Sequence, residues 1–161
     1  MPSYSAYIHS PVGPIEIWGD DDFVSKVNFA DEIKADTEHL PKVIRDCRQQ
    51  LEEYFAGMRT EFSLLLSQSG TDFQRQVWTE LCNIPYGKTI SYLQLAQKIG
   101  DVKSIRAVGT ANGRNNLAII VPCHRVIGSN GTLVGYAGGL EKKKWLLDFE
   151  SRDTGQQKLD F

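Results

Sequence analysis

Alternating apolar and polar residues in the first part of the chain predict three short strands followed by one helix. Stretches rich in Ser, Pro, Gly and Asp separate the strands and favour turns. From Pro41 to Gly57, apolar residues recur at helical spacing, and Thr60 to Leu66 returns to an apolar strand pattern. The three expected strands are Tyr4 to His9, Ile15 to Trp18 and Phe23 to Phe29.

The chain beyond the polar linker Ser67 to Gly70 has a mostly helical pattern. Capping boxes that begin at Thr71 and Ser91 open two helices, and Gly100 ends the second of them. A third helix is expected from Lys103 to Asn112, before a polar loop. Two short helices joined by a tight turn resemble a helix-turn-helix, although an ordinary helical hairpin has the same pattern.

An apolar, β-branched run from Ile119 to Val121 predicts a buried strand. Pro122 ends it, because proline has no N–H to donate to a ladder. Cys123 and His124 are therefore presented together where the strand gives way to a turn. A thiol becomes a good nucleophile only when a neighbouring base or cation helps it to ionise. An isolated pair of this kind is more often a buried thiol beside a hydrogen-bonded histidine, so the rest of the chain must decide.

Residues 128–150, before the C-terminal tail, are expected to form a turn, a short hairpin, a loop and a helix. Residues 128–131 are a turn, across which Leu133-Val134 is expected to pair back as a short hairpin. A Gly-rich loop at 135–139 leads into a helix from Leu140 to Glu150. The three consecutive lysines 142–144 are interpreted as the exposed face of that helix.

Composition and charge divide the chain in the same place as the pattern does. The 161 residues, 41% of them hydrophobic, suit a soluble globular protein and contain no membrane-spanning run. Residues 1–69 carry 6 Lys and Arg against 12 Asp and Glu, whereas residues 70–150 carry 10 against 6. We therefore expect an N-terminal structural domain over 1–69, a C-terminal domain over 70–150 with a face for a polyanion, and a tail over 151–161.

The cysteine and histidine content argues against a disulfide framework and against a metal. The three cysteines are widely spaced and odd in number, which favours a reducing compartment, and Cys47 falls on the apolar stripe of its helix. The three histidines form no zinc-binding spacing with them. We expect no metal, no cofactor and a cytoplasmic location, associated with the nucleoid if the source is bacterial.

Five segments carry a family resemblance: Ile84 to Tyr92, Arg106 to Gly109, Ile120 to Ile127, Gly135 to Gly139 and Trp145 to Glu150. In order and spacing they resemble the methylated-DNA–protein-cysteine methyltransferases, also called O6-alkylguanine-DNA alkyltransferases. The resemblance covers nearly all of residues 71–150, and the first half matches loosely. It implies an α+β protein with a small ribonuclease-H-like sheet and helix, followed by a mostly helical, winged-helix-like domain that contains a helix-turn-helix.

The resemblance implies repair of DNA by direct reversal. Cys123 would attack the alkyl carbon on guanine O6 and keep the alkyl group as a thioether, which spends the protein in one event. His124 would take the thiol proton through a bound water, Glu150 would orient the imidazole, and Asn115 would brace the turn. Arg125 is expected to be a structural salt-bridge partner.

The resemblance also implies that the lesion is flipped out of duplex DNA from the minor groove. Arg106 would fill the gap in the stack, and Tyr92 would donate a proton to the leaving guanine. The N–H of Ala137 would bond O6, and the carbonyls of Cys123 and Val126 would accept from the exocyclic amine. The residues expected to contact DNA are Arg106, Ala107, Gly109 and Ser129, with Ala111 as a further small residue on the same helix.

The expected partner is double-stranded DNA containing O6-alkylguanine, bound by a monomer with no membrane involved, and O4-alkylthymine is a further candidate substrate. Two other classes of protein fit parts of the pattern. A lesion-binding protein without transfer activity would lack the nucleophile, which is present here as Cys123. A helix-turn-helix regulator with a redox-sensing thiol would form no alkyl adduct on that cysteine.

Overall fold

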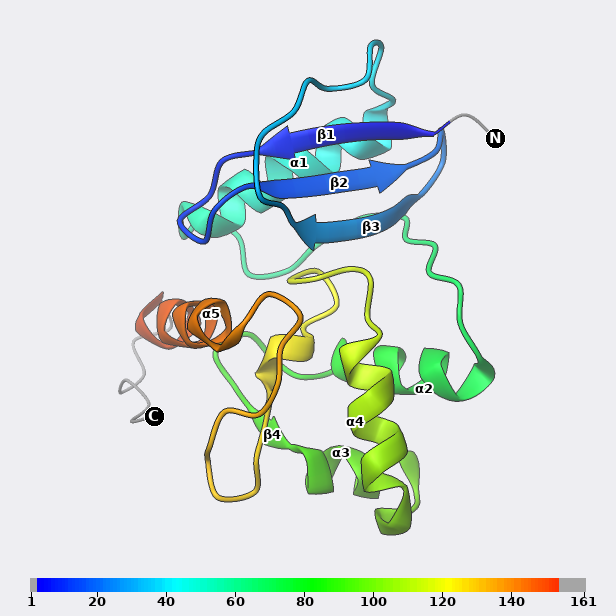
Figure 1. Ribbon diagram of the computed structural model, residues 1–161, viewed down its shortest axis with the longest axis vertical. Helices are drawn as coiled ribbons and strands as arrows, with labels where there is room; N and C mark the ends of the chain where they lie inside the picture. Colours follow the sequence, from blue (N-terminus) through cyan, green and yellow to red (C-terminus); the bar gives the residue numbers. More distant parts are fainter. Residues whose placement is uncertain (1–2, 154–161) are drawn as a thin grey trace. The chain divides into compact units, whose positions relative to one another are not determined.

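The computed structural model describes residues 3–153, which form two compact units (Figure 1). The first unit comprises the chain up to Ser69 together with Asn116–Ile120. The second comprises Gly70–Asn115 together with the chain from Val121 onward. Within residues 3–153, no helix is both long enough and apolar enough to cross a membrane.

The first unit is an antiparallel sheet with one helix packed against it (Figure 1). Its strands β1 (Tyr4–Ile8), β2 (Ile15–Gly19) and β3 (Val24–Phe29) lie in that order. Helix α1 (Lys42–Phe55) contacts all three strands. Alternate residues of β2 are buried, so one face of the sheet carries the core. The three strands and the helix predicted from the pattern are confirmed.

Helix α1 supplies the other half of this core. The ring of Tyr54 is fully buried, with centroid distances of 5.1 Å to Phe55 and 5.8 Å to Phe62. Burial raises the pKa of the Cys47 thiol to about 12, so this cysteine stays protonated and acts as a small apolar side chain. The interpretation of Cys47 as a core residue is confirmed.

The strand predicted over Thr60 to Leu66 does not form. Only Leu66 makes a bridge, to Val24 of β3, with hydrogen bonds from Val24 N to Leu65 O at 2.9 Å and from Ser67 N to Val24 O at 2.9 Å. Upstream, the backbone of Ser63 bonds instead to the side-chain amide of Gln50 on α1, at 2.9 and 3.1 Å. A side chain satisfies the backbone groups that a strand would have used.

The second unit is built from helices that begin where the capping boxes predict. Thr71 and Ser91 each accept from the backbone N–H three residues on, and open α2 (Asp72–Leu81) and α3 (Tyr92–Ile99). Gly100, in the left-handed region at φ 110°, ends α3. A 3-10 turn, η1 (Val102–Ser104), then leads into α4 (Ile105–Gly113), and α3 packs against α4. The predicted helical hairpin is confirmed, with its second α-helix starting two residues late.

The apolar run ahead of Cys123 is buried but is not a strand. Leu117 makes a single bridge to Val27 of β3, and Ile119 then turns the chain with a left-handed φ of 72°. Cys123 is the first residue of a 3-10 turn, η2 (Cys123–Arg125). The prediction of burial was right and the prediction of an extended strand was wrong, because the chain uses these residues to turn after one bridge.

The hairpin predicted at Leu133-Val134 is also wrong. Strand β5 (Val126–Ile127) pairs in parallel with β4 (Ile90–Ser91), which precedes α3. The turn closes on itself through Gly128 N to Thr132 O at 2.8 Å. Its backbone is therefore satisfied locally, and residues 133–139 lead as a loop to α5 (Leu140–Asp153).

Helix α5 continues past the predicted end at Glu150. Residues 151–153 are helical, and Ser151 is buried. The rest of the predicted tail lies outside the described residues. The lysines of this helix are also not all on its exposed face, because Lys143 is fully buried while Lys142 and Lys144 are partly exposed.

Candidate active site

Cys123 is an almost fully buried thiol, with 7% of its surface exposed. Burial raises its pKa, and a hydrogen bond from Asn115 and the nearby charge of Lys143 lower it by less. The resting thiol is therefore protonated at neutral pH. A nucleophile in this state needs a base to take its proton as it reacts.

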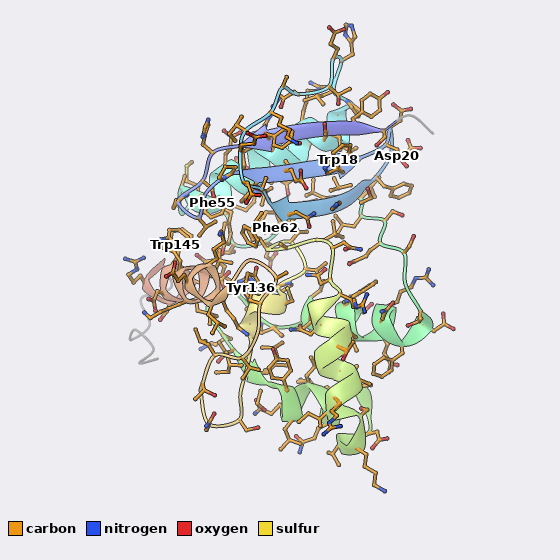
Figure 2. The ribbon with its side chains drawn as sticks, in the orientation of Figure 1. Trp18, Asp20, Phe55, Phe62, Tyr136 and Trp145 are labelled. Atoms are coloured by element: carbon orange, nitrogen blue, oxygen red, sulfur yellow. The ribbon has the colours of Figure 1, made fainter. Side chains whose placement is uncertain are left out.

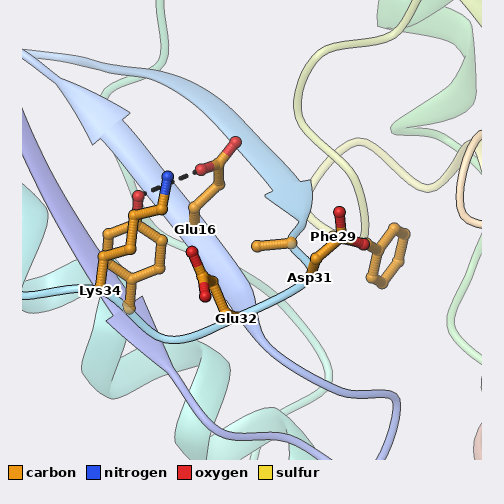
Figure 3. Close-up of a pocket in the computed structure, with 7 residues that line it drawn as sticks. Glu16, Phe29, Asp31, Glu32 and Lys34 are labelled. Carbon is orange, nitrogen blue, oxygen red and sulfur yellow. Dashed lines mark hydrogen bonds between the residues drawn. The ribbon is translucent and has the colours of Figure 1, made fainter.

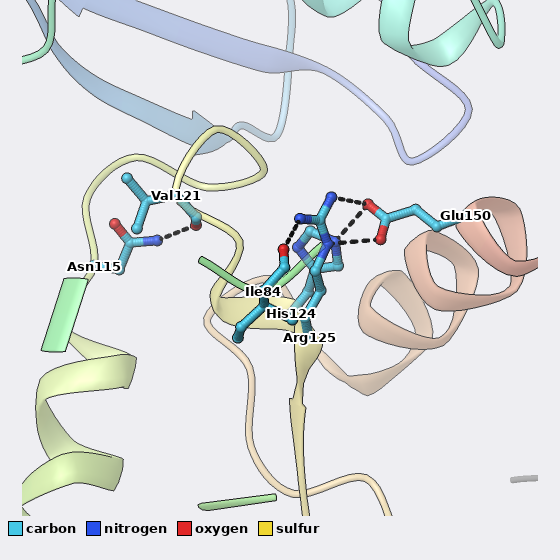
Figure 4. Close-up of polar contacts among 6 residues, drawn as sticks. All are labelled: Ile84, Asn115, Val121, His124, Arg125 and Glu150. Carbon is cyan, nitrogen blue, oxygen red and sulfur yellow. Dashed lines mark hydrogen bonds and ion pairs between the residues drawn. The ribbon is translucent and has the colours of Figure 1, made fainter. Parts of the chain in front are cut away.

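The residues that follow the cysteine form a buried ionic cluster with α5 (Figure 4). His124 Nε2 lies 2.8 Å from Glu150 Oε2. The guanidinium of Arg125 donates to both oxygens of the same carboxylate, Nε to Oε1 at 2.8 Å and Nη2 to Oε2 at 3.0 Å. Its Nη1 donates to the carbonyl of Ile84 at 2.8 Å. The predicted role of Arg125 as a salt-bridge partner is confirmed.

Electrostatics in this cluster determine which tautomer His124 adopts. Burial alone would raise the pKa of Glu150, but the hydrogen bonds from His124 and Arg125 and the charge of Arg125 outweigh it and lower the pKa, so the carboxylate is ionised. Burial lowers the pKa of His124, so the imidazole is neutral and Arg125 supplies the positive charge. An ionised carboxylate can only accept, hence the imidazole proton is on Nε2. The lone pair is on Nδ1.

Nδ1 of His124 is buried and has no hydrogen-bond partner among residues 3–153. A buried basic nitrogen without a partner is costly unless a water or a substrate reaches it. The residues present suit proton transfer, because a base with a free lone pair is held by a carboxylate and directly follows the protonated thiol in sequence. No group of three or more potential metal ligands occurs in this same span.

Asn115 lies where the chain leaves the second unit, and Val121 lies where it returns. Nδ2 of Asn115 donates to the carbonyl of Val121 at 2.8 Å (Figure 4). The side chain also bonds to the Cys123 thiol. The side-chain amide of Asn115 therefore links the two residues that flank Asn116–Ile120, and also binds the cysteine that follows this segment.

Tyr92, the first residue of α3, faces the loop ahead of α5. Its hydroxyl donates to the carbonyl of Val134 at 3.1 Å. Burial raises its pKa, the neighbouring Cys123 raises it further, and a hydrogen bond from Asn112 lowers it. Tyr136, in the same loop (Figure 2), has a buried hydroxyl whose pKa is well above the ordinary value because of burial.

Lys143 is a site residue that the sequence analysis missed. Its Nζ donates to the carbonyls of Val134 at 2.9 Å and Gly135 at 3.3 Å, and lies 5.8 Å from the centre of the Tyr92 ring. Burial lowers its pKa to about 8. Its spacing of seven residues from Glu150 would have found it, since both fall on one face of the helix.

The remaining predicted residues lie on three elements. Val126 is buried in β5, while Ala137 and Ser129 are exposed in the loops that follow it. Arg106 and Ala107 are exposed on the first turn of α4.

Gly109, on the next turn of α4, lies against Tyr92: a Cβ at this position would be 3.9 Å from the ring. Ala111 is buried and its carbonyl accepts from Trp78 Nε1 at 2.8 Å, so it faces the protein core and not a ligand surface. Ile105, the first residue of α4, is exposed.

Two family profiles match this chain. The first is described as the DNA-binding domain of 6-O-methylguanine DNA methyltransferase and matches residues 72–152. The second is described as the ribonuclease-like domain of the same methyltransferase and matches residues 3–68. Together they cover nearly the whole chain.

Individual relatives match over almost their full length. A methylated-DNA–protein-cysteine methyltransferase of Methanosarcina barkeri is 46% identical over 93% of this chain and 98% of its own. A constitutive methylated-DNA–protein-cysteine methyltransferase of Bacillus subtilis is 46% identical over 92% and 95%. Among solved structures, an O6-methylguanine methyltransferase of Mycobacterium tuberculosis has a TM-score of 0.83 and 39% identity, covering 99% of this chain and 97% of that one. A Mycobacterium tuberculosis OGT in complex with DNA has a TM-score of 0.84 and 43% identity, covering 92% and 93%.

Proposed function

Because the chain belongs to the 6-O-methylguanine DNA methyltransferase family, we propose that it removes alkyl groups from O6 of guanine in DNA and keeps each one on Cys123. The activity is that of a methylated-DNA–protein-cysteine methyltransferase, in which the protein is both catalyst and acceptor. A thioether offers no leaving group to reverse the step, so each molecule acts once. A lesion-binding role without transfer is not favoured, since the nucleophile is present.

The observation that supports the proposal is that the buried, protonated thiol of Cys123 directly precedes a neutral imidazole held by a carboxylate. Nδ1 of His124 has the lone pair that takes the proton of Cys123, through a bound water. Glu150 then stabilises the imidazolium at 2.8 Å from Nε2. Arg125 keeps the carboxylate ionised while the histidine is neutral.

The transfer is a single displacement. Sγ of Cys123 attacks the alkyl carbon, the S–C bond forms, and the bond from that carbon to O6 breaks with its electrons going to guanine. Tyr92 gives its phenol proton to a ring nitrogen of the departing base, and recovers a proton that derives from the thiol by way of His124. The net change moves one alkyl group to sulfur and one proton to guanine.

The reactive carbon of O6-alkylguanine cannot reach a buried thiol while the base is stacked, so the nucleotide must leave the duplex. We assign binding of the duplex to the exposed turn of α4, where Arg106 fills the gap in the stack and Ala107 allows close approach to the minor groove. Gly109 and Ser129 belong to the same proposed DNA contact.

We assign recognition of the flipped base to backbone groups: the N–H of Ala137 bonds O6, and the carbonyls of Cys123 and Val126 accept from the exocyclic amine. All of these residues belong to the second of the two units. We therefore assign residues 70–150 to DNA binding and transfer and residues 1–69 to a structural role, in a protein that acts as a monomer.

Repair of a defined duplex tests this function. Wild-type protein incubated with DNA containing O6-methylguanine should convert the lesion to guanine in proportion to the protein added. Cys123→Ser should convert none, because its hydroxyl is a far weaker nucleophile, yet should bind the same duplex. Conversion by Cys123→Ser at the wild-type level would contradict the assignment of the acceptor.

A further inference from the structure

Lys143 is a buried cation that the proposed reaction does not use. No part of its side chain is exposed, and its two hydrogen-bond acceptors are neutral carbonyls, those of Val134 and Gly135. Burying an ammonium is costly, and an apolar side chain of the same length would fill the space without that cost. Packing therefore does not account for a lysine at this position.

The carbonyl of Val134 is a point at which two donors meet. Lys143 Nζ donates to it at 2.9 Å, and the Tyr92 hydroxyl donates to it at 3.1 Å. A carbonyl oxygen has two lone pairs, so it can accept both bonds at once. The two donors come from different elements, because Tyr92 is the first residue of α3 and Lys143 lies on α5.

The ammonium also lies over the ring whose hydroxyl shares this acceptor. Nζ of Lys143 is 5.8 Å from the centre of the Tyr92 ring, within the range of a cation–π contact. The lysine, the phenol and the loop carbonyl therefore form one connected group. A positive charge this close to a phenol favours its ionised form over its neutral form.

The proposed reaction requires the Tyr92 hydroxyl to change its partner. A phenol has one proton to donate, and in this structure that proton is directed at Val134 O. Donation to a ring nitrogen of the flipped base breaks this bond, after which the carbonyl retains the bond from Lys143. An acceptor that keeps one donor loses less free energy than an acceptor left with none. Lys143 therefore lowers the cost of turning the phenol toward the base.

We propose that Lys143 is a positioning residue for proton donation by Tyr92: its ammonium holds the Val134 carbonyl so that the phenol can leave it for the flipped base, and its charge stabilises the phenolate that forms. This inference rests on the proposed function and on the role of Tyr92 in it. The proton passes from the phenol oxygen to guanine as the bond from O6 to the alkyl carbon breaks, with the bonding electrons going to the base. The phenolate then takes up a proton that derives from the Cys123 thiol, and Lys143 keeps its own protons throughout.

Lys143→Met tests this role, because methionine keeps much of the length of the side chain without the ammonium. Single-turnover transfer from a saturating duplex that contains O6-methylguanine should slow about tenfold, as expected for the loss of one hydrogen bond from a charged donor. The affinity for undamaged duplex should not change, since Lys143 is buried. Lys34→Met, at an exposed lysine on a pocket of the first unit (Figure 3), is the matched control and should change neither value.

Alkylation of Cys123 by iodoacetamide is the reference reaction, because iodide leaves without a proton. The charge of Lys143 also lowers the pKa of the Cys123 thiol, so Lys143→Met should slow this reaction too, but at least about threefold less than it slows transfer. In a Tyr92→Phe background, Lys143→Met should slow the two reactions equally, because the phenol that it assists is gone. The mass of the Cys123 peptide gives both rates.

Hydrogen exchange in Tyr92→Phe tests the same role without changing the lysine. The proposal requires Lys143 to hold Val134 O once the phenol has turned away, so the amides of residues 133–139 should exchange at the wild-type rate in Tyr92→Phe. The same amides should exchange faster in Lys143→Met. Faster exchange in Tyr92→Phe would show that the phenol, and not the lysine, anchors this loop, and would overturn the inference.

The remaining outcomes are distinguishable. Equal slowing of transfer and of the iodoacetamide reaction by Lys143→Met would show that the lysine acts on the thiol alone. Additive slowing of transfer by Lys143→Met and Tyr92→Phe would show that it acts independently of the phenol, and either result overturns its role. If Tyr92→Phe transfers at the wild-type rate while Cys123→Ser is inactive, the role of Tyr92 fails and this inference fails with it. If wild-type protein transfers nothing, the proposed function itself is wrong.

Discussion

At the scale of single residues, the site depends on which groups are buried and which charges neutralise them. Glu150 is 1% exposed and binds two partners at once, one neutral and one cationic. Replacing it with a neutral residue leaves the Arg125 guanidinium buried without this counter-charge, although the Ile84 carbonyl and the Tyr86 ring remain beside it. A buried charge that loses its partner is strongly destabilising.

Glu150→Gln should therefore lower the free energy of unfolding by about 3 kcal/mol. It should also slow transfer, because the imidazolium of His124 loses its counter-charge. Urea denaturation and single-turnover kinetics measure the two effects. Glu141→Gln, on the exposed first turn of the same helix, is the control and should alter neither. Stability equal to wild type in Glu150→Gln would contradict the buried ion pair.

Lys143 predicts a stability change at alkaline pH. Its pKa of about 8 in the folded protein lies below the ordinary 10.5, so between these values the unfolded chain binds more protons. The free energy of unfolding of the protein with Lys143, minus that of Lys143→Met, should then rise with pH across this window by at most about 3 kcal/mol. Below the window the difference should be constant. Both proteins should carry Cys123→Ser so that the thiol does not titrate. A difference independent of pH would mean that folding does not lower the pKa of Lys143.

The sequence led to the proposed reacting residues but not to Lys143. Residue chemistry marked Cys123 and His124 as a candidate pair, and the family resemblance, not the chemistry alone, assigned them a role and added Glu150. Lys143 was misplaced because lysine is usually exposed. Only tertiary packing, in which the Val134 carbonyl accepts from its ammonium and the Tyr92 ring lies 5.8 Å away, reverses that preference.

At the scale of elements, helices were predictable because their ends carry local signals. Capping boxes at Thr71 and Ser91 and the left-handed Gly100 are determined by neighbouring residues. The strands at Thr60 to Leu66 and Ile119 to Val121 were not predictable, since pairing depends on partners far along the chain. Gln50 binds the backbone of Ser63 in the first segment, and Val27 pairs with Leu117 just before the second. Nothing in the local pattern identifies Gln50 or Val27 as these partners.

The exposed turn of α4 leads to a prediction about Arg106. Arg106→Ala should slow transfer from O6-methylguanine in duplex DNA about tenfold or more, because the gap left by the flipped base is unfilled. Reaction with free O6-benzylguanine should be unaffected, since no duplex has to be opened. Single-turnover rates with the two substrates make the comparison. Equal slowing with both would show that the arginine does not act on the duplex.

At the scale of the whole molecule, the two units are not separated at a single position in the sequence. Asn116–Ile120 belongs to the first unit, although both of its flanks belong to the second. Within it Leu117 and Ile119 are 1% exposed and Ile120 is 8% exposed. The family, the α+β fold and the activity predicted from sequence are confirmed by relatives of 46% identity over nearly the full length. That Asn116–Ile120 belongs to the first unit was not predicted, because its residues have the same apolar pattern as an ordinary strand.

A protein truncated before Gly70 should therefore be unstable, although all of the proposed site residues remain. Exposing the side chains of Leu117, Ile119 and Ile120 to water should cost on the order of 5 kcal/mol. Thermal unfolding should show a lower melting temperature or aggregation. Leu117→Ser, Ile119→Ser and Ile120→Ser together should restore solubility to the truncated form. A truncated protein that melts like the full chain would contradict the assignment of this segment to the first unit.

The measurement that tests the central claim most directly is the mass of the Cys123 peptide after reaction with excess DNA containing O6-methylguanine. The account predicts a gain of about 14 Da on that peptide, reaching one methyl group per protein and no more, with the peptides of Cys47 and Cys82 unchanged. Repair of the DNA without this adduct, or more than one lesion repaired per molecule, would contradict it.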